Sequence, residues 1–159
     1  MEKRYGAKKR DDQLMRIGEY KWELIYGYGT DGTMSWDWRK RYLMRKPTFE
    51  EIKSTITELI NRNVDEKILS GMTYNGHQVW LSTENQLNYK AAYDLAVLTE
   101  GRSLPVRFKF GTDEEPCYHT FESVEELGDF YALVVKHIQN ALDEGWTEKD
   151  TVDWSKFKT

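Results

Sequence analysis

The dipeptide Asn75-Gly76 is the feature of this sequence that most constrains its fold. A two-residue type I′ turn needs a positive φ angle at both central residues, and Asn followed by Gly meets that need better than most pairs. The flanking segments MTY (72–74) and HQVWL (77–81) are short and contain apolar residues. The dipeptide therefore predicts an antiparallel hairpin in the middle of the chain, with Trp80 expected in the core.

Three helix starts are predicted from capping boxes. In this motif a Ser or Thr and a Glu or Gln three residues later satisfy each other's backbone N–H groups. The pairs are Thr48 with Glu51, Thr83 with Gln86, and Ser123 with Glu126, and the glycines predicted to end these helices are Gly71, Gly101 and Gly145. Apolar residues at helical spacing predict the buried faces. These are Phe49, Ile52, Ile56, Leu59 and Ile60 in the first helix, Leu87, Ala91, Leu95 or Ala92, and Leu98 in the second, and Leu127, Phe130 or Tyr131, Val134, Ile138, Ala141 and Leu142 in the third.

Apolar and polar residues alternate with period two in two further regions, which predicts half-buried strands. Residues 19–44 read as an antiparallel hairpin around a loop at 29–33, with aromatic side chains on one face. Residues 103–111 and 117–121 read as a second hairpin. Its inward side chains, Leu104, Val106, Phe108 and Phe110, are expected to bury against the third helix, and Phe108→Ala would cost roughly 3–5 kcal/mol if that site is fully buried.

These elements predict an α+β fold, a small antiparallel sheet of β-hairpins packed against about three helices. The predicted organisation is a flexible N-terminal arm at 1–18, extended or disordered unless a partner orders it, and a basic aromatic β-hairpin at 19–46. An α+β domain at 47–145 and a C-terminal tail at 146–159 follow. The tail is expected to pack back on the domain or on a neighbour.

The net charge of −4 conceals an uneven distribution. Residues 1–46 carry twelve Lys and Arg against seven Asp and Glu, a net charge of +5, whereas residues 47–159 carry eleven against twenty, a net charge of −9. A basic, aromatic front and an acidic remainder suggest two surfaces with different partners. The alternative interpretation is a charged arm together with ordinary solvated helix faces.

The basic aromatic segment contains the candidate partner-binding residues. Tyr, Trp and Arg are enriched in protein interfaces, which favours a protein partner. Aromatic rings also stack on bases while Lys and Arg contact phosphates, so nucleic acid is the alternative partner, although the chain is acidic and has no RNP-like motif. The candidates are Trp36, Trp38, Arg39, Lys40, Arg41, Tyr42, Arg45 and Lys46.

The sequence predicts no catalytic, metal or cofactor site, and hence a protein that is not an enzyme. No two of the three histidines, His77, His119 and His137, stand at metal-ligand spacing, and Cys117 has no evident base with an orienting third group. Each of these residues is expected to be a surface or packing residue. The glycines of residues 27–32 lack the Lys-Ser/Thr pair of a phosphate loop.

Composition also bears on location. No apolar run approaches the roughly 20 residues of a membrane-spanning helix, and the charged N-terminus does not resemble a signal peptide. The single cysteine cannot form an intrachain disulfide. The expectation is a protein that is cytoplasmic when made, which includes one later carried in a virus particle, with no membrane partner.

The segments GHQVWLSTENQLNYKAAYDL (76–95) and LPVRFKFGTDEEPCYHTF (104–121), followed by an amphipathic helix, resemble a known family. The chain is similar to uncharacterised phage and prophage proteins of Bacteroides-type gut bacteria. They carry a small domain of unknown function that is also found in tail-fibre and tail-assembly proteins. The resemblance covers roughly 72–144 well and 19–71 more loosely.

The resemblance implies a non-enzymatic virion or tail component, or an assembly factor, that acts by protein–protein contacts. The implied partners are other phage structural proteins and a second copy of the chain. The family supplies no catalytic residue. Polar contacts are expected from Asn85, Gln86 and Asn88.

Overall fold

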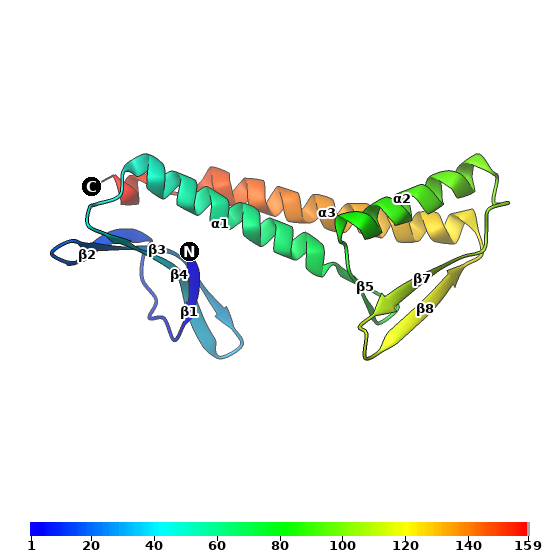
Figure 1. Cartoon of the computed structure of the whole chain (residues 1–159), viewed down its shortest axis with the longest axis horizontal. Coiled ribbons are helices and arrows are strands. Elements are labelled where there is room, and N and C mark those ends of the chain that lie inside the picture. The colour runs from blue at the N-terminus through cyan, green and yellow to red at the C-terminus, as the bar shows by residue number, and fades with distance from the viewer. Residues whose placement is uncertain (159) are drawn as a thin grey trace. The chain divides into compact units, whose positions relative to one another are not determined.

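The computed structural model describes residues 1–158 (Figure 1). In it the chain forms two compact units. Unit 1 comprises Met1–Arg62 and the chain from Glu148 onward, and unit 2 comprises Asn63–Thr147. The division falls within two helices, α1 (Phe49–Ser70) and α3 (Val124–Thr151). The fold is α+β, as predicted: three helices, a four-stranded antiparallel sheet and two hairpins.

The four-stranded sheet belongs to unit 1 and has the order β1-β4-β3-β2. Its strands are β1 (Glu2–Tyr5), β2 (Gln13–Gly18), β3 (Lys21–Asp31) and β4 (Met34–Leu43). The central pair β3–β4 confirms the predicted hairpin at 19–44. The strands run further into the predicted loop than expected, because Asp31 pairs with Met34 and only two residues remain for the turn.

Two strands lie where the sequence predicted a flexible arm. β1 pairs with β4 and β2 pairs with β3, so both edges of the sheet come from residues 1–18. The prediction missed them because edge strands are commonly charged and need no apolar alternation of their own. β1 is ordered by pairing with β4, which is distant in sequence, whereas β2 forms a local hairpin with the strand that follows it, β3.

The core of unit 1 lies between the sheet and α1. Leu24 is fully buried and Tyr26 nearly so, and both pack against one face of the helix. The short 3-10 helix η1 (Trp154–Phe157) adds Phe157, which is 2% exposed. This confirms that the tail packs back on the domain. The helix residues of this core are Ile52, Ile56, Leu59 and Ile60, as predicted.

Both ends of α1 agree with the sequence signals. The backbone N–H of Thr48 donates to the Glu51 carboxylate at 2.7 Å, and the N–H of Glu51 donates to Thr48 Oγ1 at 3.2 Å, which is a complete capping box. Gly71 ends the helix with a φ of 72°. A Cβ at this position would meet the backbone oxygen of Val79 at 1.8 Å, so only glycine fits here.

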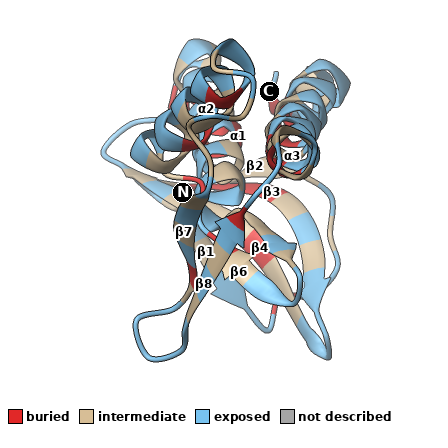
Figure 2. Ribbon diagram, turned by 90° about the vertical axis from the view of Figure 1, so that its right-hand side faces the viewer, coloured by how far each residue is buried: buried red, intermediate tan, exposed pale blue. Residues whose placement is uncertain are grey.

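Unit 2 contains two hairpins, all of α2 (Thr83–Leu98) and most of α3. β5 (Met72–Tyr74) and β6 (His77–Val79) form the first hairpin. Its turn residues have φ angles of 49° at Asn75 and 80° at Gly76, which confirms the predicted turn. β7 (Val106–Gly111) and β8 (Pro116–Phe121) form the second hairpin. Its turn, residues 112–115, is exposed throughout (Figure 2).

Aromatic side chains fill the core of unit 2. Phe130 of α3 is fully buried, and its ring lies 5.0 Å from that of Phe121 and 5.4 Å from that of Phe110, between centroids. Phe108 is half-buried in the same cluster, with its ring 4.8 Å from that of Tyr89. The predicted register of β7 is therefore confirmed, since all its inward residues contact this core.

The second helix, α2 (Thr83–Leu98), differs from the prediction in its start and in its buried face. Ser82 is the N-cap and accepts from the N–H of Asn85, so Thr83 with Gln86 is not a capping box. The Gln86 side chain instead donates to the backbone oxygen of Leu81 at 2.7 Å. The buried face carries Tyr89 and Ala96 rather than the predicted leucines, because alanines let the helix approach the core while Tyr89 reaches its rings. The predicted residues Leu87, Ala91, Leu95 and Leu98 are exposed.

Two further expectations are corrected in unit 2. Trp80 is 46% exposed, and its neighbours Val79 and Leu81 are buried in its place. α3 does not end at Gly145 but continues to Thr151. Gly145 is buried and follows Ala141 by four residues, so it extends the buried stripe of the helix instead of capping it.

Replacement of Phe130 by alanine is expected to lower the free energy of unfolding by roughly 3–5 kcal/mol, because it empties a fully buried site surrounded by five rings. Urea unfolding followed by fluorescence measures the change. Leu133→Ala on the same helix is the control, since Leu133 is 47% exposed. Equal losses of unfolding free energy in the two variants would contradict the central place of Phe130 in this core.

Candidate interaction surface

Strand alternation divides the candidate residues between two faces of the unit 1 sheet. Six of the eight lie on β4, where successive side chains point to opposite faces. The even-numbered residues project toward α1, and the odd-numbered residues project to the other face. The first set is Trp36, Trp38, Lys40 and Tyr42, and the second is Arg39 and Arg41, while Arg45 and Lys46 follow the strand.

Residues on the α1 side are held by contacts within unit 1. Trp38 and Tyr42 pack against the core of this unit. Lys40 Nζ donates to Thr55 Oγ1 at 3.0 Å, and the Tyr42 hydroxyl lies 3.0 Å from the same oxygen. Thr55 is itself 6% exposed. These side chains therefore join the sheet to the helix and are not freely available to a partner.

Cationic side chains of the chain itself lie over several aromatic rings of the sheet, the four below among them. A cation over a ring face is attracted by the ring quadrupole. One face of each ring is therefore occupied, which reduces the surface on which a base could stack. The pairs, with distances from the cation to the ring centroid, are Lys3 with Trp36 at 4.2 Å, Lys40 with Tyr42 at 5.1 Å, Arg62 with Trp38 at 5.4 Å and Arg16 with Trp22 at 5.9 Å.

Asp31 organises the end of the β3–β4 hairpin. It accepts from Lys3 Nζ at 2.8 Å and from Trp36 Nε1 at 3.0 Å. The hydrogen bond from Lys3, followed by that from Trp36, holds the pKa of the Asp31 carboxyl below its usual range. This fixes Trp36 in place and attaches edge strand β1 to the hairpin.

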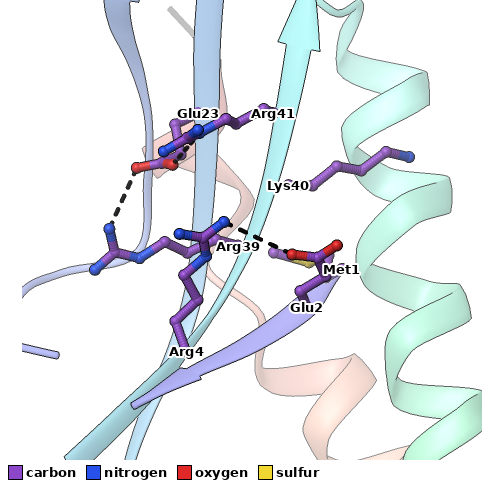
Figure 3. Close-up of a pocket in the computed structure, with 7 residues that line it drawn as sticks. All are labelled: Met1, Glu2, Arg4, Glu23, Arg39, Lys40 and Arg41. Atoms are coloured by element: carbon purple, nitrogen blue, oxygen red, sulfur yellow. Dashed lines mark hydrogen bonds and ion pairs between the residues drawn. The ribbon is translucent and has the colours of Figure 1, made fainter. Parts of the chain in front are cut away.

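A cleft of about 380 Å³ lies on the opposite side of β4 (Figure 3). Three arginines and two glutamates converge on it, and Lys40 extends away from them toward α1. The guanidinium groups of the three arginines therefore face the carboxylates of Glu2 and Glu23 in this cleft. The lining residues are Met1, Glu2, Arg4, Glu23, Arg39, Lys40 and Arg41.

Arg39 is fixed by a buried ion-pair network beneath the cleft. Its Nε lies 2.7 Å from Asp37 Oδ1 and its Nη2 lies 3.0 Å from Oδ2, a bidentate pair with a carboxylate that is 1% exposed. Its Nη1 also reaches Glu23 at 3.4 Å. The hydrogen bonds that Arg39 donates to Asp37 raise the pKa of Arg39 above its ordinary value. Arg39 therefore has a structural role.

Arg4 and Arg41 retain binding capacity in this cleft. Their side chains are 45% and 56% exposed. Arg41 contacts Glu23 through Nε at 3.0 Å, and Arg4 lies 3.7 Å from Glu2. A guanidinium offers five N–H donors in a planar fork, so both can bind a further carboxylate or phosphate.

Arg45 belongs to the start of α1. It forms a bidentate pair with Glu51 at 2.8 Å and 2.6 Å. These hydrogen bonds, together with that from the Thr48 N–H, lower the pKa of Glu51 to about 2. Lys46 is exposed beside this cap.

The histidines and the cysteine belong to unit 2. His119 Nε2 is 2.8 Å from Glu126 Oε1, and His137 Nε2 is 3.1 Å from the backbone oxygen of Lys67. His77 is exposed and Cys117 is half-buried. Within residues 1–158, no group of three or more His, Cys, Asp and Glu side chains is arranged to hold a metal ion.

Sequence reasoning missed three residues that shape the cleft: Arg4, Glu23 and Asp37. For Glu23 and Asp37 the signal was present, because period-two alternation places both on the same face as Arg39 and Arg41. For Arg4 no local signal exists, since its position follows from the pairing of β1 with β4.

Comparisons with family models, with curated proteins and with solved structures found no match for this chain. Within the described residues, no helix is long and apolar enough to cross a membrane.

Removal of the Asp37 carboxylate is expected to destabilise the protein by roughly 3 kcal/mol, because Asp37→Ala leaves Arg39 without its main partner. Chemical denaturation measures the loss. The double variant Asp37→Leu/Arg39→Met removes both charges and should be closer to the wild type. Lys3→Ala, which breaks a more exposed pair, should cost less than about 1 kcal/mol. A double variant as unstable as Asp37→Ala would contradict this assignment.

Glu51 predicts a pH dependence. Its folded pKa lies below the ordinary value of 4.5, so the stability it contributes is present above pH 4.5 and is lost as the pH falls toward about 2. Because the group is solvent-exposed, the effect should be small. The melting temperature of wild type should exceed that of Glu51→Gln at pH 6, and this difference should shrink by pH 2.5. A difference that is constant over this range would contradict the assignment.

Proposed function

We propose that this chain is a non-enzymatic structural protein of a phage or prophage, a virion or tail component or an assembly factor, that acts by protein–protein contacts. The proposal combines the family resemblance of residues 72–144 with an exposed apolar patch on unit 1. Other structural proteins of the same particle and a second copy of the chain are its proposed partners.

The observation that carries the proposal is the patch formed by Tyr20, Leu43 and Met44. These residues are 59%, 61% and 81% exposed. Their backbones are neighbours at the end of β4, because the Met44 N–H donates to the Tyr20 backbone oxygen at 2.8 Å and Leu43 pairs with Lys21. Met44 has a φ of 74°, an uncommon conformation for a residue with a side chain. Exposed apolar residues held in such a conformation support a contact surface.

The patch is suited to a protein partner. Tyr and Met are enriched in protein interfaces, and Arg41 supplies a partly free guanidinium on the same sheet. Nucleic acid is supported less well, because cations of the chain already cover one face of the sheet's aromatic rings. Contact with nucleic acid through Arg4 and Arg41 is the competing proposal, and the experiment below distinguishes it.

Point variants are the suitable test. Deletion of residues 1–17 would remove β1 and most of β2 and so disrupt the sheet. Tyr20→Ser combined with Met44→Asn removes the apolar contacts, and Asn tolerates the left-handed conformation at residue 44. Leu133→Ser, at an exposed leucine of α3, is the matched control.

Sedimentation velocity of the full chain, alone and with purified products of adjacent genes, measures assembly. The wild type and the control should form a complex, and the double variant should bind about tenfold or more weakly, since central interface residues carry most of the binding energy. Equal melting temperatures would establish that all three proteins are folded. A strictly monomeric wild type that binds no neighbouring product would contradict the proposal.

A parallel measurement tests nucleic acid. The anisotropy of labelled single-stranded DNA is recorded with wild type and with Arg4→Glu/Arg41→Glu at 50 and 200 mM salt. The proposal expects no tight binding. Affinity that falls steeply with salt and is lost in the charge-reversed variant would favour the competing function, because released counterions drive such binding.

A further inference from the structure

A groove in unit 2 runs between β7 and one face of α2. Four consecutive residues of β7, Val106 to Lys109, line a cleft of about 420 Å³. Side chains of consecutive strand residues point to opposite faces, so a cleft lined by all four lies along the edge of the strand. The other wall comes from helix positions spaced i, i+3, i+4 and i+7, which form a single face. They are Asn85, Asn88, Tyr89 and Ala92.

The hydrogen-bond pattern of the hairpin shows which backbone groups face this groove. The N–H of Thr112 donates to the backbone oxygen of Glu115, and Pro116, which pairs with Gly111, has no N–H to donate. Along an antiparallel ladder, residue pairs that share backbone hydrogen bonds alternate with pairs that do not. The even-numbered residues of β7 therefore bond to β8. The N–H and C=O groups of Arg107 and Lys109 point away from β8, toward the groove.

These edge groups have no backbone partner among residues 1–158. β7 pairs with β8 alone, and no backbone hydrogen bond joins Arg107 or Lys109 to β6 or α2. An exposed row of such groups is a template for an additional strand. Peptide-binding domains use this arrangement, in which main-chain hydrogen bonds give affinity and flanking side chains give specificity.

Charge identifies the kind of strand that fits. The cleft is lined by two cations, Arg107 and Lys109, and by no carboxylate. Arg107 lies 5.0 Å from the Tyr118 ring and has no ion pair in the described part of the chain. Within residues 1–158, the one ion pair of Lys109 is with Asp113, an exposed residue of the β7–β8 turn. Opposite charges directly across a strand pair stabilise it.

We propose that this groove binds an extended acidic segment of a partner protein, which adds as a strand to the free edge of β7. Its acidic side chains lie opposite Arg107 and Lys109, and its alternate residues face the helix. Asn88 is exposed, and its side chain, which has no hydrogen bond within residues 1–158, offers its amide to this segment. A second cleft of about 570 Å³ shares Asn85 and Lys109 and reaches the exposed Trp80, but Asp113 and Glu114 line it, so their charges confine an acidic segment to the cleft beside Arg107 and Lys109.

The groove and the Tyr20 patch are formed by different residues, so either proposal can fail alone. The probe is a fluorescein-labelled peptide, Glu-Val-Glu-Ser-Glu-Val-Glu, titrated with the full chain and followed by anisotropy. Two matched peptides test the mechanism. One replaces each Glu by Lys, and the other carries N-methyl groups on alternate amides, which removes the donors that a strand needs.

The acidic peptide should bind, and both matched peptides should bind at least about tenfold more weakly. The Lys peptide lacks charge complementarity, and the N-methylated peptide lacks main-chain donors. Arg107→Glu should weaken binding of the acidic peptide about tenfold through cross-strand repulsion. Lys136→Glu makes an equal charge change at an exposed residue of α3. Its affinity for the acidic peptide should stay within about twofold of the wild type, which would exclude a non-specific effect of net charge. Asn88→Trp fills the groove and should also prevent binding.

Amide hydrogen exchange locates the peptide independently of the variants. The amides of Arg107 and Lys109 should become protected on binding, whereas that of Phe108, already bonded to β8, should change little. Absence of binding, equal binding of the N-methylated or Lys peptide, or protection outside β7 would overturn the proposal. The melting temperature of Arg107→Glu is the control for folding. If it equals that of the wild type, the loss of binding is not caused by unfolding.

Discussion

The ring of Phe130 is the contact on which unit 2 depends. Five other aromatic rings, from β5, α2, β7 and β8, lie 5.0 to 6.3 Å from it, between centroids. A two-stranded hairpin is marginally stable by itself, and unit 2 contains two of them with no hydrogen-bonded ladder between them. Burial against α3 must therefore supply their stability. The same contacts set the distance from Tyr89 of α2 to Phe108 of β7, and hence the width of the groove between these elements.

Unit 1 shows how a strand can separate two kinds of chemistry that the sequence mixes. The segment at 36–46 reads as one basic aromatic region, yet alternation directs its rings toward α1 and two of its arginines to the opposite face. Burial of Asp37 then fixes one arginine structurally. On the sheet itself, what is left exposed is smaller than the composition suggests: the guanidinium groups of Arg4 and Arg41 on one face, and apolar residues at the end of β4. Arg45 and Lys46 are exposed beyond the strand.

Local signals in the sequence predicted most elements, because each depends on residues that are neighbours in the chain. The Asn75-Gly76 turn and the Thr48–Glu51 capping box are examples, and the core-facing register of β7 was also predicted. Most of the errors concern choices made by distant partners. β1 pairs with the distant β4, and the buried face of α2 follows the aromatic core instead of its own leucines. For the same reason the cleft around Arg4 and the groove beside β7 could not be found in the sequence. β2 is the exception, because it forms a local hairpin with β3 and was still missed.

Exposed strand edges connect stability with recognition in this protein. An open edge invites pairing with any strand, and proteins commonly prevent it with charged side chains. β1 carries Glu2, Lys3 and Arg4 at one edge of the four-stranded sheet, so charges of both signs flank its backbone. β7 carries only cations, Arg107 and Lys109, beside its open edge. Cations of one sign repel a second β7 and any basic strand while they attract an acidic one. A feature that limits aggregation can therefore also select a partner.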